Sequence, residues 1–493
     1  MLSLSEVVAL SQTYNVIPLV KRLFASTETP LGVYSKLCAE RPNTFLLESA
    51  EQGVWGRYSF IGVSSRGQLL ADENRAWFVG PRALPDSELP ETPLEALEAL
   101  QQGWNSAPTD FPLSSGLVGF ISWAAVNLLE KLPAAGAKDY EVPLLAFNQF
   151  SELVVMDHQK SEVLLVSVIF NDGSDLALSY DRAVESIQDL QKKLSEPTSA
   201  RLSSPSWPEP NFTKRTRPEE FMAQIDKAKE HVRAGDVFQV VISQRFDQHV
   251  TADALDVYRA MRAINPSPYM YLTRWQDQHG DYAIVGSSPE ALVKVSGRRA
   301  VTHPIAGSRP RSSDTARDIA LGAELLADTK EQSEHLMLVD LARNDLLKVC
   351  EPSTVGVTEF MQVHRFSHVM HLVSTVEGEL RDGLGPVAAM RATFPAGTLS
   401  GAPKPRALEI IHNLEPADRG LFGGVVGYFD FAGNSDLAIA IRTALVRDGV
   451  ARIQAGAGIV LDSVPQSEYA ETEAKAAVVL RAVAAANEMT NEI

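Results

Sequence analysis

Two pairs of glutamates, far apart in the chain, have the residue type and spacing of a metal site. Glu331 and Glu334 open an apolar run with helical periodicity, and Glu468 and Glu471 repeat the same spacing near the C-terminus. Residues three apart share one face of a helix, so each pair presents two carboxylates side by side. One such pair alone is more often favourable charge at a helix N-terminus. Two pairs with only Lys475 nearby suit a hard cation, and they predict a Mg²⁺ site if the helices converge.

Three other segments have the composition of an anion-binding pocket. In His303–Arg311, two prolines bracket small residues and two arginines lie beside them, which favours a turn with accessible N–H groups. On a strand predicted over 437–446, Arg442 shares a face with alanines, which leaves room for a ligand beside a bidentate donor. Ala455–Gly458 adds N–H groups of the kind that hold carboxylates or phosphates, although glycines in strands more often mark bulges.

A further strand is predicted over Val237–Phe246, with two unlike faces. Phe238, Val240 and Ile242 point one way, whereas Gln239 and Ser243 point the other. Such a polar row is more often a solvated sheet face, and otherwise it lines a site.

Composition restricts the partners of these segments. The net charge of −17 argues against nucleic acid or an anionic membrane, so an anionic ligand must meet local positive charge or a metal. Cys38 and Cys350 are the only cysteines, which fits a reducing compartment. Apolar runs such as Val163–Phe170 are too short to span a membrane. We therefore expect a cytoplasmic protein with no membrane and no nucleic-acid partner.

The length of 493 residues exceeds one compact core, so we expect the elements that position these residues to form two domains or one large composite. Proline and serine concentrate in Ser195–Pro210, so we assign an N-terminal domain to 1–195, a linker to 196–215 and a second domain to 216–493. The first domain mixes short strands with a helix over 181–194. The second ends in a predicted β-meander over 425–431, 437–446 and 451–460.

Four long motifs resemble those of the chorismate-utilising enzymes, in the same order along the chain. They are Pro304–Arg311, Glu334–Asp345, Gly397–Lys404 and Gln454–Gly458. Within that family, nearly the whole chain most resembles the anthranilate synthase large subunits, component I. The resemblance implies an α+β fold, with a large two-layer β-sheet core surrounded by helices. It also implies a lyase that converts chorismate and ammonia to anthranilate and pyruvate, the first committed step of tryptophan biosynthesis.

The resemblance assigns roles to individual residues. Mg²⁺ is expected at Glu334 and Glu471, with Glu331 and Glu468 in support, directly or through water. The expected catalytic residues are the general acid Glu290, the active-site histidine His371, and Thr398. Without the resemblance, Glu290 is an ordinary glutamate in a turn and His371 a structural histidine. The implied substrate-binding residues are Gly307, Ser308, Phe422, Arg442, Gly456, Ala457, Gly458 and Lys475.

Several positions distinguish subfamilies or depart from the family pattern. Relatives that add water carry a lysine base at the position of Gln239, and those that make aminodeoxychorismate carry a lysine nucleophile at Ala306. Glutamine and alanine supply neither, which favours direct attack by ammonia. Ser308 replaces the usual threonine and Phe422 a common tyrosine. The segment Phe120–Trp123 departs from a Gly-Tyr-Asp pattern.

The resemblance also implies two partners. Ammonia is expected from a glutamine amidotransferase subunit, component II, because this chain lacks the glutaminase triad. Tryptophan is expected as a feedback inhibitor that binds between the predicted domains. The implied effector residues are Leu47, Glu48, Ser49, Pro268, Tyr269 and Met270. Two alternatives stay open: a 2-amino-2-deoxyisochorismate synthase, which keeps the enolpyruvyl group, and a non-catalytic tryptophan-sensing subunit.

Overall fold

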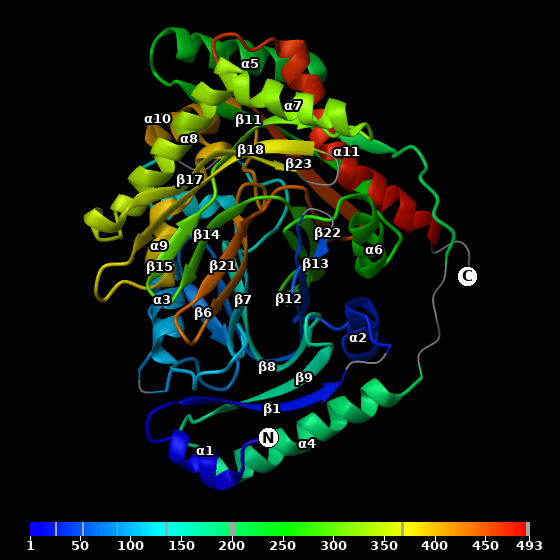
Figure 1. The fold of residues 1–493 in the computed structure, drawn as a ribbon, viewed down its shortest axis with the longest axis vertical. Coiled ribbons are helices and arrows are strands. Elements are labelled where there is room, and N and C mark those ends of the chain that lie inside the picture. The colour runs from blue at the N-terminus through cyan, green and yellow to red at the C-terminus, as the bar shows by residue number, and fades with distance from the viewer. Residues whose placement is uncertain are drawn as a thin grey trace.

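The computed structural model describes residues 1–24, 27–51, 54–85, 87–133, 137–197, 203–365 and 369–489. Figure 1 shows strands in the middle of the molecule and helices around them. The N-terminal strand and helices lie at the bottom of that view, and the helices of the second half of the chain lie mainly at the top.

The α-helices in the described ranges are α1 Leu4–Leu10, α2 Pro30–Leu37, α3 Pro93–Gly103, α4 Leu176–Ser195, α5 Pro218–Arg233, α6 Ala254–Ile264, α7 Thr315–Ala327, α8 Thr329–Leu347, α9 Pro386–Thr393, α10 Lys404–Leu414 and α11 Pro465–Met489. The 3-10 helices are η1 Trp123–Leu128, η2 Pro352–Thr354 and η3 Gly397–Leu399.

The strands are β1 Val16–Phe24, β2 Thr44–Glu48, β3 Ala50–Glu51, β4 Val54–Trp55, β5 Tyr58–Ala71, β6 Ala76–Val79, β7 Gly116–Ile121, β8 Leu145–Asp157, β9 Glu162–Phe170, β10 Phe212–Lys214, β11 Gln239–His249, β12 Tyr269–Asp277, β13 Gly280–Ser288, β14 Ala291–Ser296, β15 Arg299–Thr302, β16 Ile305–Pro310, β17 Gly356–Arg365, β18 Val369–Glu379, β19 Gly401–Ala402, β20 Val425–Asp430, β21 Ser435–Ile439, β22 Thr443–Arg447 and β23 Val450–Ile459.

The β core has two antiparallel layers joined through the long strands β5 and β8. One layer runs β15-β14-β21-β20-β7-β8, and the other runs β5-β2-β12-β13-β22-β23-β11. Phe120 of the first layer packs edge-on against Trp275 of the second, with ring centroids 5.3 Å apart. Helices cover the outer faces, so the predicted α+β fold with a two-layer core is confirmed.

The two predicted domains share these layers. β2 of the first segment pairs with β12 of the second, and β7 pairs with β20. The two segments are therefore continuous in hydrogen bonding, and the boundary at 196–215 stays a prediction, with 198–202 outside the described residues. No helix in the described ranges combines the length and apolarity that crossing a bilayer demands.

Helices α8 and α11 carry the paired glutamates, and they pack on different strands of the sheet. α11 contacts β23 and α6 through small side chains such as Ala482 and Ala486, which allow close helix approach. α8 contacts β16 and β18, and buried His335 bonds Ser374 Oγ of β18 over 2.6 Å. Gly397 lets η3 pack on α8, because a Cβ there would lie 2.1 Å from Leu341 Cδ2.

Three local predictions need correction. Arg442 has a left-handed φ of +52° and interrupts the strand predicted over 437–446, so it does not share a face with the alanines of β21 and β22. Phe238 is 74% exposed, whereas the polar side chains Gln239 and Ser243 are buried, so their row is not a solvated face. The predicted turn at 303–311 is largely the strand β16, with a bulge at Gly307.

Candidate active site

The two acidic helix ends converge electrostatically. Burial raises the pKa of Glu334, and the negative charges of Glu331 and Glu471 raise it further. Burial likewise raises the pKa of Glu468, which also lies within the field of Glu471 and of Lys330 at the start of α8. The carboxylates of α8 and α11 therefore act on one another across the gap between the helices. This approach is the condition on which the Mg²⁺ prediction depends.

The geometry of these carboxylates bears on the metal prediction. Among the described residues, no three acidic, histidine or cysteine side chains are already arranged around one metal position. Glu471 instead bonds Lys475 Nζ over 2.7 Å, and Glu331 lies 3.5 Å from Arg309 Nη1. The donors are all carboxylate oxygens, which suit Mg²⁺, and their mutual repulsion is what a cation relieves. The residues fit the ion, and the metal site stays a prediction.

Glu290 lies between β13 and β14, where a hydrogen bond from the neighbouring strand β21 holds its backbone. Its carbonyl accepts a hydrogen bond from Ile439 N over 3.0 Å, and its carboxylate Oε1 accepts one from Thr398 Oγ1 over 2.9 Å. Burial raises the pKa of this carboxyl to about 7, while the Thr398 bond and the Lys475 charge oppose that rise. A carboxyl that is still partly protonated at neutral pH has the property of a general acid.

His371 of β18 stands opposite Ser308 of β16, in the bulged part of that strand pair. Its Nδ1 donates to Gly307 O over 2.7 Å, so in the neutral ring the lone pair belongs to Nε2. Burial lowers the pKa of His371, and the nearby Arg442 charge lowers it further. The lowered pKa favours the neutral ring, which leaves Nε2 as its acceptor atom.

Gly307 explains how β16 reaches the acidic helix. It has a φ of +65°, and a Cβ there would lie 3.0 Å from Glu331 Oε2. A side chain at this position would be strained and would press on the carboxylate. The arginines beside it are already paired: Arg309 bonds Asp328 and Arg311 bonds Asp318. Both arginines are therefore held by aspartates, and the anion site expected in this segment stays a prediction.

Arg442 and Lys475 are two further positively charged residues, and a hydrogen bond joins them. Arg442 is buried, which lowers the pKa of its guanidinium, and its Nη1 donates to Lys475 O over 2.6 Å. Lys475 Nζ donates to Gly456 O over 3.0 Å. Because a non-glycine residue at φ +52° is strained, the fold holds Arg442 in an unfavourable conformation at this place.

The glycine segment of β23, Gly456–Gly458, forms the wall beside Lys475. Gly456, Ala457 and Gly458 pair with β11 on one side, whereas the ladder with β22 ends at Ile453. Gly458 is close to Gln239, since a Cβ on the glycine would lie 2.6 Å from Gln239 Nε2. Gln239 of β11 therefore lies against the glycine segment of β23.

The structure brings together Glu290, Thr398, His371, Gly307, Ser308, Glu331, Glu334, Arg442, Gly456, Ala457, Gly458, Glu468, Glu471 and Lys475, through the contacts and electrostatic neighbours given above. Phe422 is not linked to them by these contacts: it is buried with Arg419 5.6 Å above its ring. Sequence reasoning missed Lys330, which faces Glu334 and Glu468, and it did not place Arg309 beside Glu331. The position of Lys330 directly before Glu331 in the sequence was the available signal.

A sequence profile described as chorismate binding enzyme matches residues 42–481. Anthranilate synthase component 1 of Mycolicibacterium smegmatis is 47% identical over 491 residues, covering 97% of this chain and 93% of that protein. The corresponding protein of Arthrobacter globiformis is 47% identical over 504 residues, covering 99% of this chain and 94% of the relative. The chain belongs to the anthranilate synthase component 1 family.

Solved structures agree with this assignment. Anthranilate synthase component I from Streptococcus pneumoniae superposes with a TM-score of 0.78 at 32% identity, covering 93% of this chain and 99% of that one. The menaquinone-specific isochorismate synthase of Escherichia coli shares the fold, with a TM-score of 0.69 at 20% identity, covering 97% and 98%. Membership in the anthranilate synthase component 1 family makes the protein a lyase.

A second candidate site of this family member is a cavity of about 840 Å³ between the two layers. All six residues predicted for the effector line it: Leu47, Glu48, Ser49, Pro268, Tyr269 and Met270. The two halves meet because β2 pairs with β12, with Glu48 opposite Met270. Glu48 is buried, and its carboxylate accepts hydrogen bonds from Tyr258 and Arg262.

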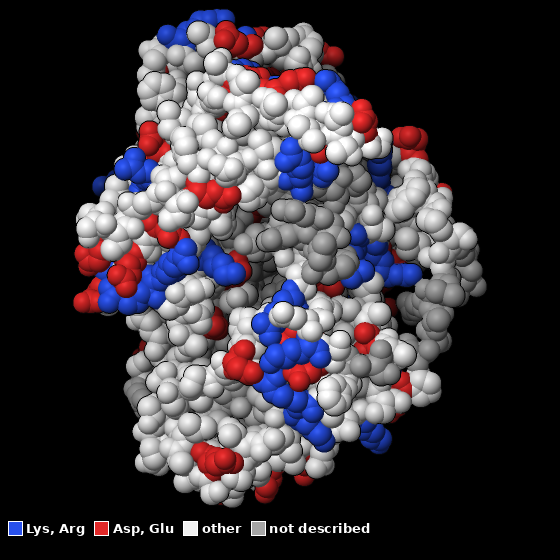
Figure 2. All heavy atoms as spheres, in the orientation of Figure 1, with Lys and Arg blue, Asp and Glu red and all other residues white. Residues whose placement is uncertain are grey.

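Figure 2 shows how charged side chains are distributed on one face of the molecule. On the face in Figure 2, acidic and basic side chains are interspersed and separated by uncharged surface. Such a pattern differs from the continuous basic surface that follows a nucleic-acid backbone.

Proposed function

We propose that the protein is the large subunit of an anthranilate synthase, which converts chorismate and ammonia to anthranilate and pyruvate with Mg²⁺. The observation that carries the proposal is the position of Glu290. Its carboxyl, with a pKa raised to about 7, lies within the electrostatic reach of Lys475, which in turn bonds Glu471 and Gly456. One acid, one cationic group and the acidic end of α11 are thus linked to one another.

Substrate binding follows from charge. Chorismate carries two carboxylates, and the protein is strongly acidic, so each carboxylate needs a local counter-charge. Arg442 and the β23 wall at Gly456–Gly458 would receive the enolpyruvyl carboxylate, with Lys475 beside it. Glu334 and Glu471, supported by Glu331 and Glu468, would hold Mg²⁺ against the ring carboxylate. When bound, the ion stabilises negative charge that develops on that carboxylate.

Glu290 performs the first proton transfer. Ammonia forms a bond to ring C2 while the bond from C4 to its hydroxyl breaks, and Glu290 gives its proton to the departing oxygen, which leaves as water. The added nitrogen loses its extra proton. The C2 proton is then removed, the C2–H electrons complete the aromatic ring, and the bond from C3 to the enolpyruvyl oxygen breaks. The enolate that leaves takes up one proton and becomes pyruvate. His371, neutral and oriented by Gly307 O, is placed to handle protons in this space.

Two positions favour ammonia over other nucleophiles. Gln239 has no basicity at neutral pH, so it does not activate water for addition to the ring. Ala306 is buried on β16 and has no nucleophilic atom. The name component 1 carried by the relatives implies a second component, and we propose that this partner is a glutamine amidotransferase that delivers ammonia.

The cavity between the layers is proposed as the site of feedback inhibition by tryptophan. It combines aromatic and apolar walls, such as Tyr58 and Met270, with polar groups, such as Ser49 and Lys294. The ring of an aromatic amino acid needs apolar walls, and its amino and carboxylate groups need polar partners. The walls of the cavity come from strands that continue toward the active site, since β12 leads through β13 to the Glu290 turn.

The deciding experiment incubates the purified chain with chorismate, ammonium and Mg²⁺, and separates the products. Fluorescent anthranilate together with one equivalent of pyruvate supports the proposal. A non-aromatic amino acid that retains the enolpyruvyl group would instead identify a 2-amino-2-deoxyisochorismate synthase. Tryptophan binding without any turnover would identify a non-catalytic sensing subunit.

A further inference from the structure

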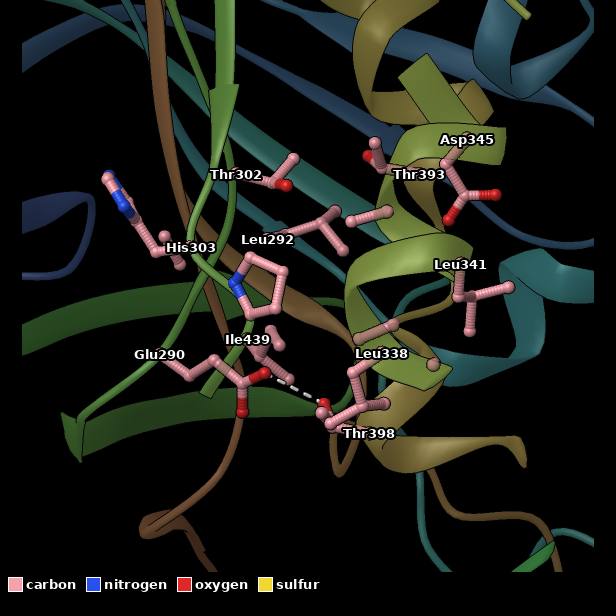
Figure 3. A pocket seen from close by; sticks show the side chains of 15 residues that line it. Glu290, Leu292, Thr302, His303, Leu338, Leu341, Asp345, Thr393, Thr398 and Ile439 are labelled. Atoms are coloured by element: carbon pink, nitrogen blue, oxygen red, sulfur yellow. Dashed lines mark hydrogen bonds between the residues drawn. The ribbon is translucent and has the colours of Figure 1, made fainter. Parts of the chain in front are cut away.

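Glu290 also borders a small recess of about 60 Å³ that includes none of the residues proposed to bind the substrate carboxylates. In Figure 3, Glu290 and Thr398 lie at one end of this recess, and Asp345 and Thr393 lie at the other. Apolar side chains, including Leu338 and Leu341, form one wall between the two ends. The general acid therefore faces a second space besides the one that holds Lys475.

Thr302 indicates what this recess contains. Its side chain points toward the recess in Figure 3, it is 6% exposed, and its Oγ1 has no hydrogen-bond partner within the described chain. A buried hydroxyl left without a partner is unfavourable, so native structures nearly always satisfy it. A small polar ligand in the recess would satisfy Thr302.

Water is the ligand that fits. A single water needs roughly 10–15 Å³ of such space and two to four polar partners. The recess has room for more than one, and Thr302, Glu290 and Asp345 supply oxygen atoms along it. The titratable side chains that line it are Glu290, His303 and Asp345, with His303 Nδ1 bonded to Thr375 Oγ1 over 3.1 Å.

The far end leads toward solvent through ion pairs. Asp345 Oδ2 accepts from buried Lys404 Nζ over 2.6 Å, and Asp345 Oδ1 accepts from Lys348 Nζ over 2.9 Å. The Lys348 side chain is 56% exposed. A charged group at this end therefore touches both the recess and a residue in contact with bulk water.

We propose that the recess holds a short chain of water molecules that returns a proton to Glu290 after each turnover. The inference rests on the proposed function, in which Glu290 loses its proton to the departing hydroxyl. A proton from bulk water enters beside Lys348 and Asp345. Each water oxygen then accepts one proton and releases another, and the last proton forms the O–H bond of Glu290. Thr302 is a positioning residue that holds this chain.

The first test is structural and does not require turnover. A high-resolution crystal structure of the full chain is expected to show ordered water within hydrogen-bond distance of Thr302 Oγ1 and continuing toward Glu290. Thr302→Val, which is similar in shape but lacks the hydroxyl, is expected to lose the water at position 302. A dry recess in the parent protein overturns the inference, whether or not the chain makes anthranilate.

The second test is kinetic. Thr302→Val is expected to lower kcat about threefold to tenfold, less than the roughly 10²–10⁴-fold effect of losing the acid itself. KM for chorismate is expected to stay constant and the solvent deuterium isotope effect on kcat to rise. Thr302→Ser, which keeps the hydroxyl, is expected to restore kcat. Thr393→Val is the matched control, because Thr393 Oγ1 is already bonded to Ala389 O within α9.

The kinetic results distinguish failure of the proton-path inference from failure of the proposed function. If the parent makes anthranilate but Thr302→Val has the same kcat and isotope effect, the inference fails while the proposed function stands. If the loss in Thr302→Val appears as a raised KM for ammonia at unchanged kcat, the recess carries ammonia and the proton path is wrong. Melting temperatures of the three variants show whether any loss comes from unfolding.

Discussion

Thr398 donates its hydroxyl hydrogen to Glu290 Oε1 over 2.9 Å, and this bond opposes the effect of burial on the acid. Burial alone disfavours the carboxylate, whereas a donor aimed at the carboxylate favours it. The pKa of about 7 is thus a balance between a protein environment that keeps the proton on and a hydroxyl that helps it leave. A general acid needs both properties.

Removing the hydroxyl in Thr398→Val should raise the pKa of Glu290 above about 7. The protonated acid then persists to higher pH, so the alkaline limb of the kcat–pH profile should move upward by about one unit, from a hydrogen bond to a charged group worth roughly 1.5 kcal/mol. Thr398→Ser should leave the limb in place. Superimposable limbs for Thr398→Val and the parent would show that the limb belongs to another group.

Glu290→Gln should reduce kcat by roughly 10²–10⁴-fold and also change the pH dependence of stability. The folded-state pKa of Glu290 is raised from 4.5 to about 7, so the folded parent binds more protons in that window and loses stability as pH rises through it. The contribution is at most about 3 kcal/mol. Glutamine has no such titration. Thermal unfolding from pH 5 to 8 should therefore show a flatter curve for Glu290→Gln.

The matched control for that comparison is Glu473→Gln, because Glu473 is paired with Lys214 near the surface of α11. Its stability curve should follow the parent through pH 7. If Glu290→Gln and Glu473→Gln give the same curve, the raised pKa of Glu290 is not the source of the pH dependence.

Glu334→Gln and Glu471→Gln should each weaken Mg²⁺ binding by at least about tenfold, since even groups that only support metal ligands commonly contribute that much. Calorimetric titration of the full chain with Mg²⁺ measures this directly. Glu473→Gln again serves as the control with the same change of charge on α11. Equal Mg²⁺ affinity in all four proteins would refute the metal assignment.

Sequence spacing predicted which glutamates share a helix face, because that depends only on helical periodicity. It did not predict that α8 and α11 converge, because the approach depends on packing between residues more than a hundred positions apart. Burial and the charge of Glu331 raise the pKa of Glu334, and the further rise from the charge of Glu471 arises only from that approach. The two-layer core was predictable from family resemblance, not from the strand pattern alone.

Arg442 shows a second limit of sequence reasoning. Alternation of small and large residues predicted an unbroken strand, yet the chain takes a left-handed turn at Arg442 and aims the guanidinium at Lys475 O. Local propensity disfavours that conformation, and only the surrounding fold imposes it. Similarly, nothing in the sequence shows that Arg309 and Arg311 are already paired with aspartates.

Ser49→Phe should blunt inhibition by tryptophan and spare turnover without it. Ser49 lines the cavity between the layers, and a phenyl group there occupies part of the roughly 840 Å³. Ser195→Phe, at the exposed end of α4, is the control. Inhibition curves at fixed chorismate measure the effect. Equal inhibition of Ser49→Phe and Ser195→Phe would place the effector elsewhere.

Glu48→Ala should act through stability, although Glu48 belongs to the predicted effector residues. Its carboxylate is 5% exposed and accepts from Tyr258 and Arg262, so the substitution leaves a buried hydroxyl and a guanidinium without their acceptor. Breaking a buried pair in this way costs roughly 3–5 kcal/mol. Chemical denaturation should show the loss. Full stability with lost inhibition would instead mean that Glu48 contacts the effector directly.

Arg442→Lys should raise KM for chorismate by about tenfold or more, because lysine cannot offer the two parallel donors that a carboxylate prefers. The substitution keeps the charge, so a site that needs only positive potential would tolerate it. Arg481→Lys, on the exposed side of α11, controls for the exchange itself. Since Arg442 also donates to Lys475 O, its loss frees that turn, and a crystal structure of the variant would show whether Lys475 still reaches Gly456 O. If KM is unchanged while Lys475 keeps its place, the enolpyruvyl carboxylate binds elsewhere, and the strained φ of Arg442 requires another explanation.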